Sequence, residues 1–290
     1  MSSMIDLKIS NTEHCKIPES IKSSNIMYDI GDYINEGGNA SVFVCSEQRS
    51  GQEFAIKFLT KVYGKRLKRF KQEQQIHQQI KHDHIVKYVC DGKISGEFYK
   101  GKRNRGKKEI PYVIMEKCDE TLHEYLQRSA SSIPYHDYIA QFRGLTEALS
   151  VLHKIAIHRD IKPTNILVKD GVWKLSDFGL CAFTDLDKSK DITTINEKVG
   201  PMNWMSPESN TKFAGFNSDI VTQSDVFQLA SIFWLVVNKR HPTGVLTKDD
   251  WDGPDNLFAP LFKSLQHSPD RRPTNGDMFH QSMVDAIEIV

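Results

Sequence analysis

The chain of 290 residues contains no long apolar run. The best candidate, around residues 229–237, is far too short to cross a bilayer as a helix. The first residues also lack a basic segment followed by an apolar one, so we expect no secretion leader. These two absences argue against a membrane-anchored receptor, and we expect no membrane partner for the chain as given.

Cysteine and net charge are also low. Five cysteines are scattered without a C-x-x-C spacing: Cys15, Cys45, Cys90, Cys118 and Cys181. This pattern is typical of reduced thiols in the cytoplasm and argues against a disulfide framework or a zinc site. The net charge is +1, so the chain as a whole has no general attraction to nucleic acid or membranes. The content of 39% apolar and 26% charged residues is ordinary for a globular protein.

What the chain does contain is a dense polar segment at residues 158–165, with the sequence HRDIKPTN. Phosphoryl transfer requires a carboxylate that accepts the proton of an attacking hydroxyl, a cation for the phosphates, and a ligand for a metal ion. Asp160, Lys162 and Asn165 supply these three groups. Twelve residues after Asn165, Asp177 begins an Asp-Phe-Gly triplet and could chelate the metal. The two motifs resemble the catalytic loop and metal-binding triplet of the eukaryotic-type Ser/Thr protein kinase family.

Upstream residues extend this resemblance. Residues 54–57 read FAIK, an apolar run ending in a lysine, which is typical of a buried strand. Sixteen residues later, Glu73 begins the apolar spacing of a helix face. The resemblance implies that Lys57 contacts the α- and β-phosphates of ATP and that Glu73 pairs with Lys57. Either residue alone would be interpreted as a surface charge, but their order before the two downstream motifs favours catalysis.

The resemblance also implies a nucleotide site. Residues 34–42 read INEGGNASV where the family has G-x-G-x-x-G-x-V, so only the central glycine is kept and the loop is expected to be stiffer. The implied nucleotide-binding residues are Ile34, Gly37, Gly38, Val42, Ala55, Lys57, Met115, Glu116, Cys118 and Leu167. Asn165 and Asp177 are the implied ligands for Mg²⁺, with Mn²⁺ as an alternative metal. For the apolar members of this set, simple core packing is the alternative interpretation.

The segment after the metal-binding triplet implies control and protein substrates. Residues 205–208 read MSPE and resemble the A-P-E element of the family. Arg159 implies an activation segment that carries phosphate, and the acceptors are expected at Thr193 and Thr194. Pro201 stands where the family has a threonine, so the hydroxyl link from that position to the catalytic residues is missing.

Three further residues in this half of the chain are expected to be structural. The resemblance implies a buried ion pair between Glu208 and Arg272. It also implies that Asp225 braces the backbone of the catalytic loop. Loss of one partner from a buried ion pair typically costs about 3–5 kcal/mol.

The apolar spacing predicts one α+β domain after a short extension. Residues 1–27 are polar and without clear periodicity, and they predict an extension that is partly disordered. Residues 28–290 predict a two-lobed protein kinase domain. Its small, β-rich N-lobe with one main helix covers residues 28–117, and its larger, mostly helical C-lobe covers residues 118–290. The resemblance implies that ATP and the metal bind between the lobes.

A basic insertion falls within the expected N-lobe. Residues 93–108 contain seven lysines and arginines against a single acid, Glu97. We expect a protruding loop between two strands, and a solvated basic hairpin is the simplest interpretation. An acidic or RNA partner is the alternative, because a local cluster can bind phosphates without global charge. Insertions at this point also occur in kinases that phosphorylate a translation initiation factor.

The sequence therefore predicts a cytoplasmic, ATP- and Mg²⁺-dependent serine/threonine protein kinase that is itself a phosphoprotein. Lys162, two residues after Asp160, favours the serine/threonine branch over the tyrosine branch. A pseudokinase with the same fold is the main alternative, favoured by the irregular glycine loop, by Pro201 and by His77, which stands where the family prefers leucine or methionine. The intact set of Lys57, Glu73, Asp160, Lys162, Asn165 and Asp177 argues against it. A small-molecule phosphotransferase is a third possibility, which the MSPE element disfavours.

Overall fold

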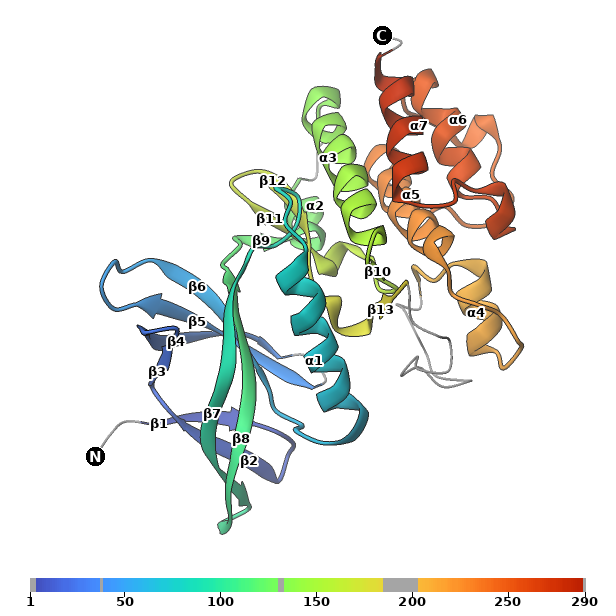
Figure 1. Ribbon diagram of the computed structural model, residues 1–290. Helices are drawn as coiled ribbons and strands as arrows, with labels where there is room; N and C mark the ends of the chain where they lie inside the picture. Colours follow the sequence, from blue (N-terminus) through green and yellow to red (C-terminus); the bar gives the residue numbers. More distant parts are fainter. Residues whose placement is uncertain (1–3, 37–38, 130–132, 185–202, 289–290) are drawn as a thin grey trace. The chain divides into compact units, whose positions relative to one another are not determined.

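The computed structural model describes residues 4–36, 39–129, 133–184 and 203–288, and they form two compact units (Figure 1). The first unit contains the chain up to residue 78 together with residues 87–118. The second contains residues 79–86 and the chain from residue 119 onward. The first is built mainly of strands and the second mainly of helices, which confirms the α+β class predicted from the sequence.

An eight-stranded antiparallel sheet forms the first unit, with the order β1-β2-β7-β8-β6-β5-β4-β3. Its strands are β1 (Met4–Lys8), β2 (Glu13–Pro18), β3 (Ser20–Ser23), β4 (Ile26–Glu36), β5 (Ala40–Glu47), β6 (Glu53–Leu59), β7 (Tyr88–Lys100) and β8 (Arg103–Glu116). Alternate residues of the central strands, including Phe43, Ile56, Phe58 and Ile114, are buried in one apolar core. This period of two leaves the other face of these strands for polar side chains and the helix.

The prediction for residues 1–27 was wrong, because described residues of this segment form strands instead of a disordered extension. β1 pairs with β2, and β2 pairs with the far part of β7. Leu7, Cys15 and Ile17 are fully buried against the sheet. These strands are hard to predict because they are short and because their partner, residues 97–100, lies in the insertion. Strands this short are stable only when such a partner strand is present.

The basic insertion forms the hairpin that was its simplest interpretation, and most of it is paired strand instead of loop. β7 and β8 pair from Tyr88 and Met115 as far as Lys100 and Arg103, so the insertion is a long antiparallel hairpin. Its turn contains Gly101, whose φ of +56° lies in the left-handed region that glycine adopts at little cost. Residues 100–109 are all exposed.

Helix α1 (Gly64–Gln79) is the one helix in the described part of the first unit. Its first turn contains no acid, so the positive end of the helix dipole is not compensated. Packing holds the helix instead: Phe70 lies in a small apolar cluster with Leu59 and Val113. The side-chain amide of Gln74 also donates to the Tyr112 carbonyl at 3.0 Å, which fixes the helix along β8.

The second unit packs helices around an aromatic core. Its helices are α2 (Leu122–Arg128), α3 (Tyr135–His153), α4 (Pro207–Phe213), α5 (Thr222–Asn238), α6 (Asp255–Ser264) and α7 (Gly276–Glu288). The short strands are β9 (Glu120–Thr121), β10 (Ala156–Ile157), β11 (Ile166–Lys169), β12 (Val172–Leu175) and β13 (Ala182–Phe183). Phe142 of α3 stacks on Phe233 of α5 at 3.8 Å between ring centroids. α7 begins at Gly276, where an added Cβ would lie 2.4 Å from the Ser150 backbone nitrogen.

Within the part of the chain that the structure describes, no helix combines the length and the apolar character needed to cross a membrane.

Candidate active site

In the first unit, the predicted lysine and glutamate form a close ion pair. Lys57 Nζ lies 2.6 Å from Glu73 Oε1, and both side chains are largely buried. The sheet register explains the position of the lysine: Ile56 and Phe58 enter the core, so Lys57 between them lies on the opposite face. α1 packs on Leu59, two residues further along the same face, which brings Glu73 beside Lys57.

The residues predicted to bind the nucleotide lie on several elements. Val42 pairs with Lys57, and Ala55 pairs with Met115, so these residues share one face of the sheet. Glu116 and Cys118 follow at the end of β8, where the Glu116 carboxylate accepts the Lys87 backbone N–H at 2.6 Å. Ile34 is 46% exposed on β4, and Leu167 is half-buried on β11 of the second unit. Gly37 and Gly38 lie outside the described residues.

In the second unit, the loop at residues 158–165 brings three predicted catalytic groups together. Lys162 Nζ donates to Asp160 Oδ2 at 2.9 Å. The side-chain amide of Asn165 donates to the same oxygen at 2.8 Å and to the Asp160 carbonyl at 2.9 Å. Because its nitrogen is committed to Asp160, the amide oxygen of Asn165 is left to act as an acceptor or as a metal ligand.

The backbone of this loop is held by Asp225 on α5. One carboxylate oxygen accepts the His158 backbone N–H at 2.6 Å, and the other accepts that of Arg159 at 2.8 Å. Arg159 has a φ of +71°, a left-handed conformation that is costly for a side chain of this size. The two charge-assisted hydrogen bonds offset this strain, and they present the following residue, Asp160, in a fixed orientation.

Ser176, which directly precedes Asp177, connects it to Asn165 by two hydrogen bonds. The carbonyl of Asn165 accepts the backbone N–H of Ser176 at 2.9 Å and its hydroxyl at 2.8 Å. Asp177 itself has a φ of +59°, and the ring of Phe178 lies 5.5 Å from that of His158. The two predicted metal ligands therefore belong to one hydrogen-bonded segment.

This donor set fits a hard divalent cation. A carboxylate and an amide oxygen are ligands that Mg²⁺ accepts, with water and phosphate oxygens completing its octahedron. No cluster of three or more His, Cys, Asp or Glu side chains suited to a metal occurs among the described residues. Asp177 and Asn165 thus suit a metal that arrives with a phosphate substrate, and they are too few for a closed structural site.

The electrostatics of Asp160 match a proton acceptor. Burial raises the pKa of its carboxyl above the ordinary value, and the Lys162 ammonium opposes this rise. The negative charge of Asp177 raises the pKa further. A carboxylate held by a cation and made more basic by burial is suited to accept a proton from a hydroxyl group.

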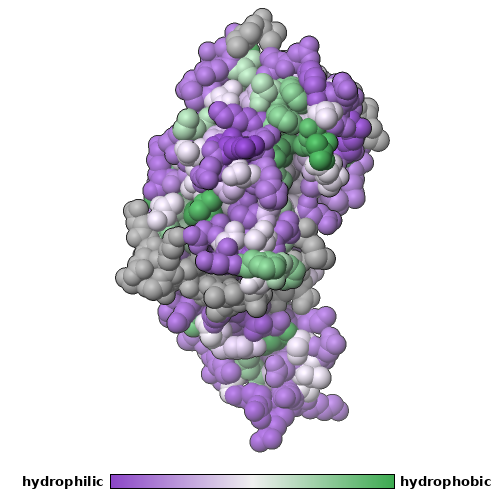
Figure 2. Space-filling view, turned by 90° about the vertical axis from the view of Figure 1, so that its right-hand side faces the viewer, coloured by the Kyte–Doolittle hydropathy of each residue, from purple (hydrophilic) through white to green (hydrophobic). Residues whose placement is uncertain are grey.

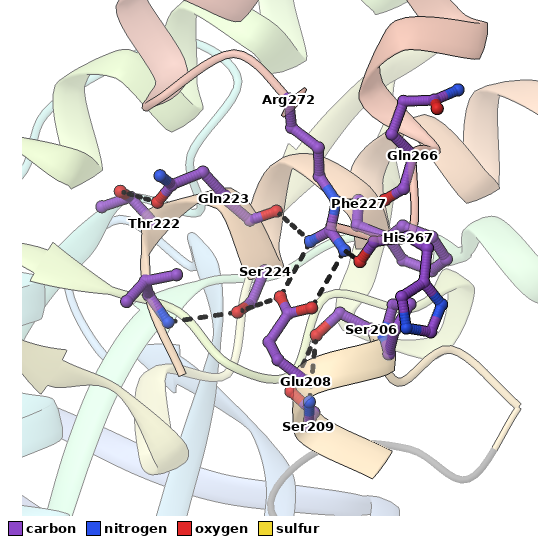
Figure 3. A network of polar contacts seen from close by, with 12 residues as sticks. Ser206, Glu208, Ser209, Thr222, Gln223, Ser224, Phe227, Gln266, His267 and Arg272 are labelled. Atoms are coloured by element: carbon purple, nitrogen blue, oxygen red, sulfur yellow. Dashed lines mark hydrogen bonds and ion pairs between the residues drawn. The ribbon is translucent and has the colours of Figure 1, made fainter. Parts of the chain in front are cut away.

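Glu208 and Arg272, predicted as an ion pair, form a bidentate contact (Figure 3). Arg272 Nη1 and Nη2 lie 2.8 and 2.9 Å from the two carboxylate oxygens of Glu208. Ser224 donates at 2.6 Å to Glu208 Oε1, the oxygen that also accepts from Arg272 Nη1. Burial alone would raise the pKa of Glu208, but the Arg272 guanidinium lowers it below its usual value. The pair joins α4 to the segment before α7.

A cavity of about 780 Å³ lies beside the loop at residues 158–165, within the second unit. Its lining includes Lys162, Thr164, Trp204, Phe227, His241 and Pro242. The ring of Trp204 meets the ring of His241 edge-on at 4.6 Å. Within the described part, neither ring nitrogen of His241 forms a hydrogen bond. The nearby backbone of Asn203 favours the protonated imidazole. Burial has the larger effect and lowers the pKa of His241.

Sequence reasoning missed several residues that support the site. His153, Gln228 and Ser176 hold the loop or its neighbours, and His241 lines the cavity. No short motif identifies them, because each acts on residues that are distant in the sequence. The predicted phosphate acceptors Thr193 and Thr194, together with Pro201, lie outside the described residues.

Comparisons with known proteins identify similar sequences. The family model described as protein kinase domain matches residues 21–280. The probable serine/threonine-protein kinase PknB of Bifidobacterium longum is 28% identical over 221 residues, which cover 74% of this chain and 30% of that protein. The interferon-induced, double-stranded RNA-activated protein kinase of Rattus norvegicus is 30% identical over 270 residues, which cover 84% of this chain and 49% of that protein.

The aligned part is thus less than half the length of either relative. The family match nevertheless extends over most of the chain, and proteins named as serine/threonine kinases are among its relatives. The chain belongs to the protein kinase family.

Proposed function

We propose that the chain transfers the γ-phosphate of ATP to serine or threonine hydroxyls of proteins. The observation that carries this proposal is the group formed by Asp160, Lys162 and Asn165, in which the lysine and the amide both lie within 2.9 Å of Asp160 Oδ2. A base, a cation and a metal ligand on one rigid loop are the groups that phosphoryl transfer needs.

Each residue has a distinct role in the proposed reaction. Asp160 orients the substrate hydroxyl and accepts its proton, while Lys162 neutralises charge that develops on the transferred phosphoryl group. Lys57, held by Glu73, binds the α- and β-phosphates. Mg²⁺ held by Asp177 and the amide oxygen of Asn165 would neutralise the phosphates. The protein therefore contributes mainly position and charge.

The cavity beside Lys162 suits the protein segment that carries the acceptor hydroxyl. It borders the loop at Lys162 and Thr164, and Trp204 also lines it. We expect Trp204→Ala to raise the KM for a protein substrate several-fold and to leave the KM for ATP unchanged. A change in the KM for ATP alone would contradict this role for the cavity.

Control by phosphorylation is the regulatory part of the proposal. Arg159 is buried next to Asp160, where its charge can attract a phosphate on the activation segment. The proposed acceptors are Thr193 and Thr194. After incubation with ATP and Mg²⁺, mass spectrometry should find phosphate on one of them, and the double alanine variant should be less active. Full activity of that variant would contradict the regulatory role.

The proposed activity is tested with γ-labelled ATP and a generic protein substrate. The wild-type chain should place label on serine or threonine, as phosphoamino acid analysis would detect. Lys57→Met and Asp177→Asn should abolish transfer, and exposed Lys263→Met should not. A chain that binds ATP but transfers no label would instead be a pseudokinase, and label only on a small molecule would indicate a different phosphotransferase.

We also place the protein in the reducing environment of the cytoplasm. All five cysteines lie among the described residues and none is in a disulfide. Burial raises the pKa of Cys15 and of Cys45 to about 12, so these thiols stay protonated and unreactive.

A further inference from the structure

The two units differ strongly in charge, although the whole chain is nearly neutral. The first unit contains 20 lysines and arginines against 13 acids, a net charge of +7. The second contains 18 against 24, a net charge of −6. An asymmetry of this size between two parts of one chain indicates that the basic part meets a polyanion.

Much of the positive charge lies on the β7–β8 hairpin. Two of its cations form contacts within the hairpin: Lys107 Nζ lies 3.6 Å from Glu97 Oε1, and Lys108 Nζ lies over the Phe98 ring at 5.0 Å. The side chains of four cations at the hairpin end are exposed and form no ion pair or hydrogen bond within the described residues. These four, called the tip cations below, are Lys100, Lys102, Arg103 and Arg105.

The tip cations stand on a rigid support. β2 pairs with β7 at residues 97–100, and the ring of His14 stacks on that of Tyr99 at 5.1 Å. On the opposite face, an added Cβ at Gly96 would lie 2.5 Å from the Cys15 sulfur, so the strands are in close contact there. Because the hairpin is held on both faces near its end, few degrees of freedom are lost when the tip binds a ligand.

The surface around the tip cations is hydrophilic. No large apolar side chain of the hairpin is exposed, as those on the described surface are Met4, Tyr33, Ile34, Tyr63, Phe213, Phe216, Val245 and Met278. In Figure 2 the lower end of the molecule, where the hairpin ends in Figure 1, is purple. Protein interfaces usually have an apolar centre and are depleted in lysine. The composition of the hairpin end is therefore unfavourable for binding another protein.

The shape also favours one kind of polyanion. Residues 100–109 are exposed along a two-stranded ribbon. The major groove of duplex DNA admits a ribbon of two strands with phosphates on either side, whereas a flat membrane would meet only its end. We propose that the tip cations bind the phosphate backbone of nucleic acid.

The binding is expected to be independent of sequence. Asn104 is the one side-chain amide in residues 99–109. Its oxygen accepts the Gly106 backbone N–H at 2.7 Å and its nitrogen donates to the Tyr99 hydroxyl at 3.4 Å, so the amide is engaged within the hairpin. Charge without a polar group to contact base edges gives affinity for phosphates only.

Fluorescence anisotropy with labelled 20-mers tests the proposal, using duplex DNA, duplex RNA and single-stranded RNA of two sequences each. The test variant changes Lys100, Lys102, Arg103 and Arg105 to serine. The control variant changes four exposed cations of the second unit to serine: Lys81, Lys154, Lys263 and Arg271. Both variants lose four positive charges, so a difference in their affinities shows that the position of the cations matters. Circular dichroism checks the folding of each variant. If the serine test variant misfolds, a variant with glutamine at the four tip positions replaces it.

At low salt the test variant should bind at least tenfold more weakly than the wild type, and the control should stay within about twofold. For duplex DNA, the slope of log K against log salt should be less negative for the test variant than for the wild type by about 3–4, since each of the four phosphate contacts contributes about 0.9. Equal weakening of both variants, no binding by the wild type, or equal competition by polyglutamate would overturn the proposal. Phosphate transfer should be the same in all variants, so this test is independent of the proposed kinase activity.

Discussion

His153 and Asp225 form a buried contact that connects three helices. His153 Nε2 donates to Asp225 Oδ2 at 3.0 Å, and its Nδ1 accepts the backbone N–H of Gly276 at 2.9 Å. Asp225 in turn holds the backbone at His158 and Arg159. The contact therefore joins α3, α5 and the start of α7. It also holds the backbone that precedes Asp160, the proposed catalytic base.

Asp225→Asn tests this support. The amide loses the negative charge that three donors share, and hydrogen bonds to charged groups contribute about 1.5–3 kcal/mol each. We expect the free energy of unfolding in urea to fall by about 3 kcal/mol and phosphate transfer to fall with it. Exposed Asp249→Asn is the control and should change neither. An Asp225→Asn variant as stable and active as the control would contradict the role.

The Glu208–Arg272 pair predicts non-additive effects on stability. Glu208→Gln leaves the Arg272 charge buried without its partner, so unfolding should become easier by about 3–5 kcal/mol. Arg272→Met should cost a similar amount. In the double variant no uncompensated charge remains, so the loss should be well below the sum of the two single losses. Urea titrations of the four proteins measure this, and additive losses would show that the pair does not act as a unit.

His84 predicts a loss of stability in mild acid. Burial lowers the pKa of His84 below its ordinary 6.5, while its Nδ1 donates to the Trp173 carbonyl at 2.8 Å. Below about pH 6.5 the unfolded chain takes up a proton that the folded chain resists, so stability is present above this pH and is lost as pH falls. His84→Gln should reduce the difference in unfolding free energy between pH 7 and pH 5.

The control for this comparison is His136→Gln, because the His136 side chain is 81% exposed. It should keep the pH dependence of the wild type. If His84→Gln and His136→Gln give the same slope, His84 does not contribute to the acid sensitivity. His241, whose pKa burial also lowers, would then be the next residue to replace.

Lys162 predicts a shift in the pH profile of the reaction. Burial raises the pKa of Asp160, and Lys162 limits the rise. Lys162→Met removes that cation, so the pKa of Asp160 should rise further and the acid limb of kcat/KM should move to higher pH. The profile is measured from pH 4.5 to 8 with γ-labelled ATP. A variant with lower activity but an unshifted limb would show that Lys162 does not act on Asp160.

Short motifs predicted much of the fold and of the proposed site. The apolar run at residues 54–57 predicted a strand that ends near a lysine, and β6 confirms it. The role of residues 158–165 came from a family resemblance and stays a prediction. Residues 1–27 were misjudged because β1 and β2 depend on β7, a partner about 80 residues away. His153 could not be identified for the same reason, since its contacts lie 72 and 123 residues further along the chain.

Single-turnover phosphate transfer by the wild type and by Asp160→Asn tests the central proposal most directly. At saturating ATP, the variant should bind nucleotide as the wild type does and transfer label to serine or threonine about 10²–10⁴ times more slowly, which is the usual contribution of a general base. Transfer by Asp160→Asn within about threefold of the wild-type rate would contradict the assignment of Asp160 as the base.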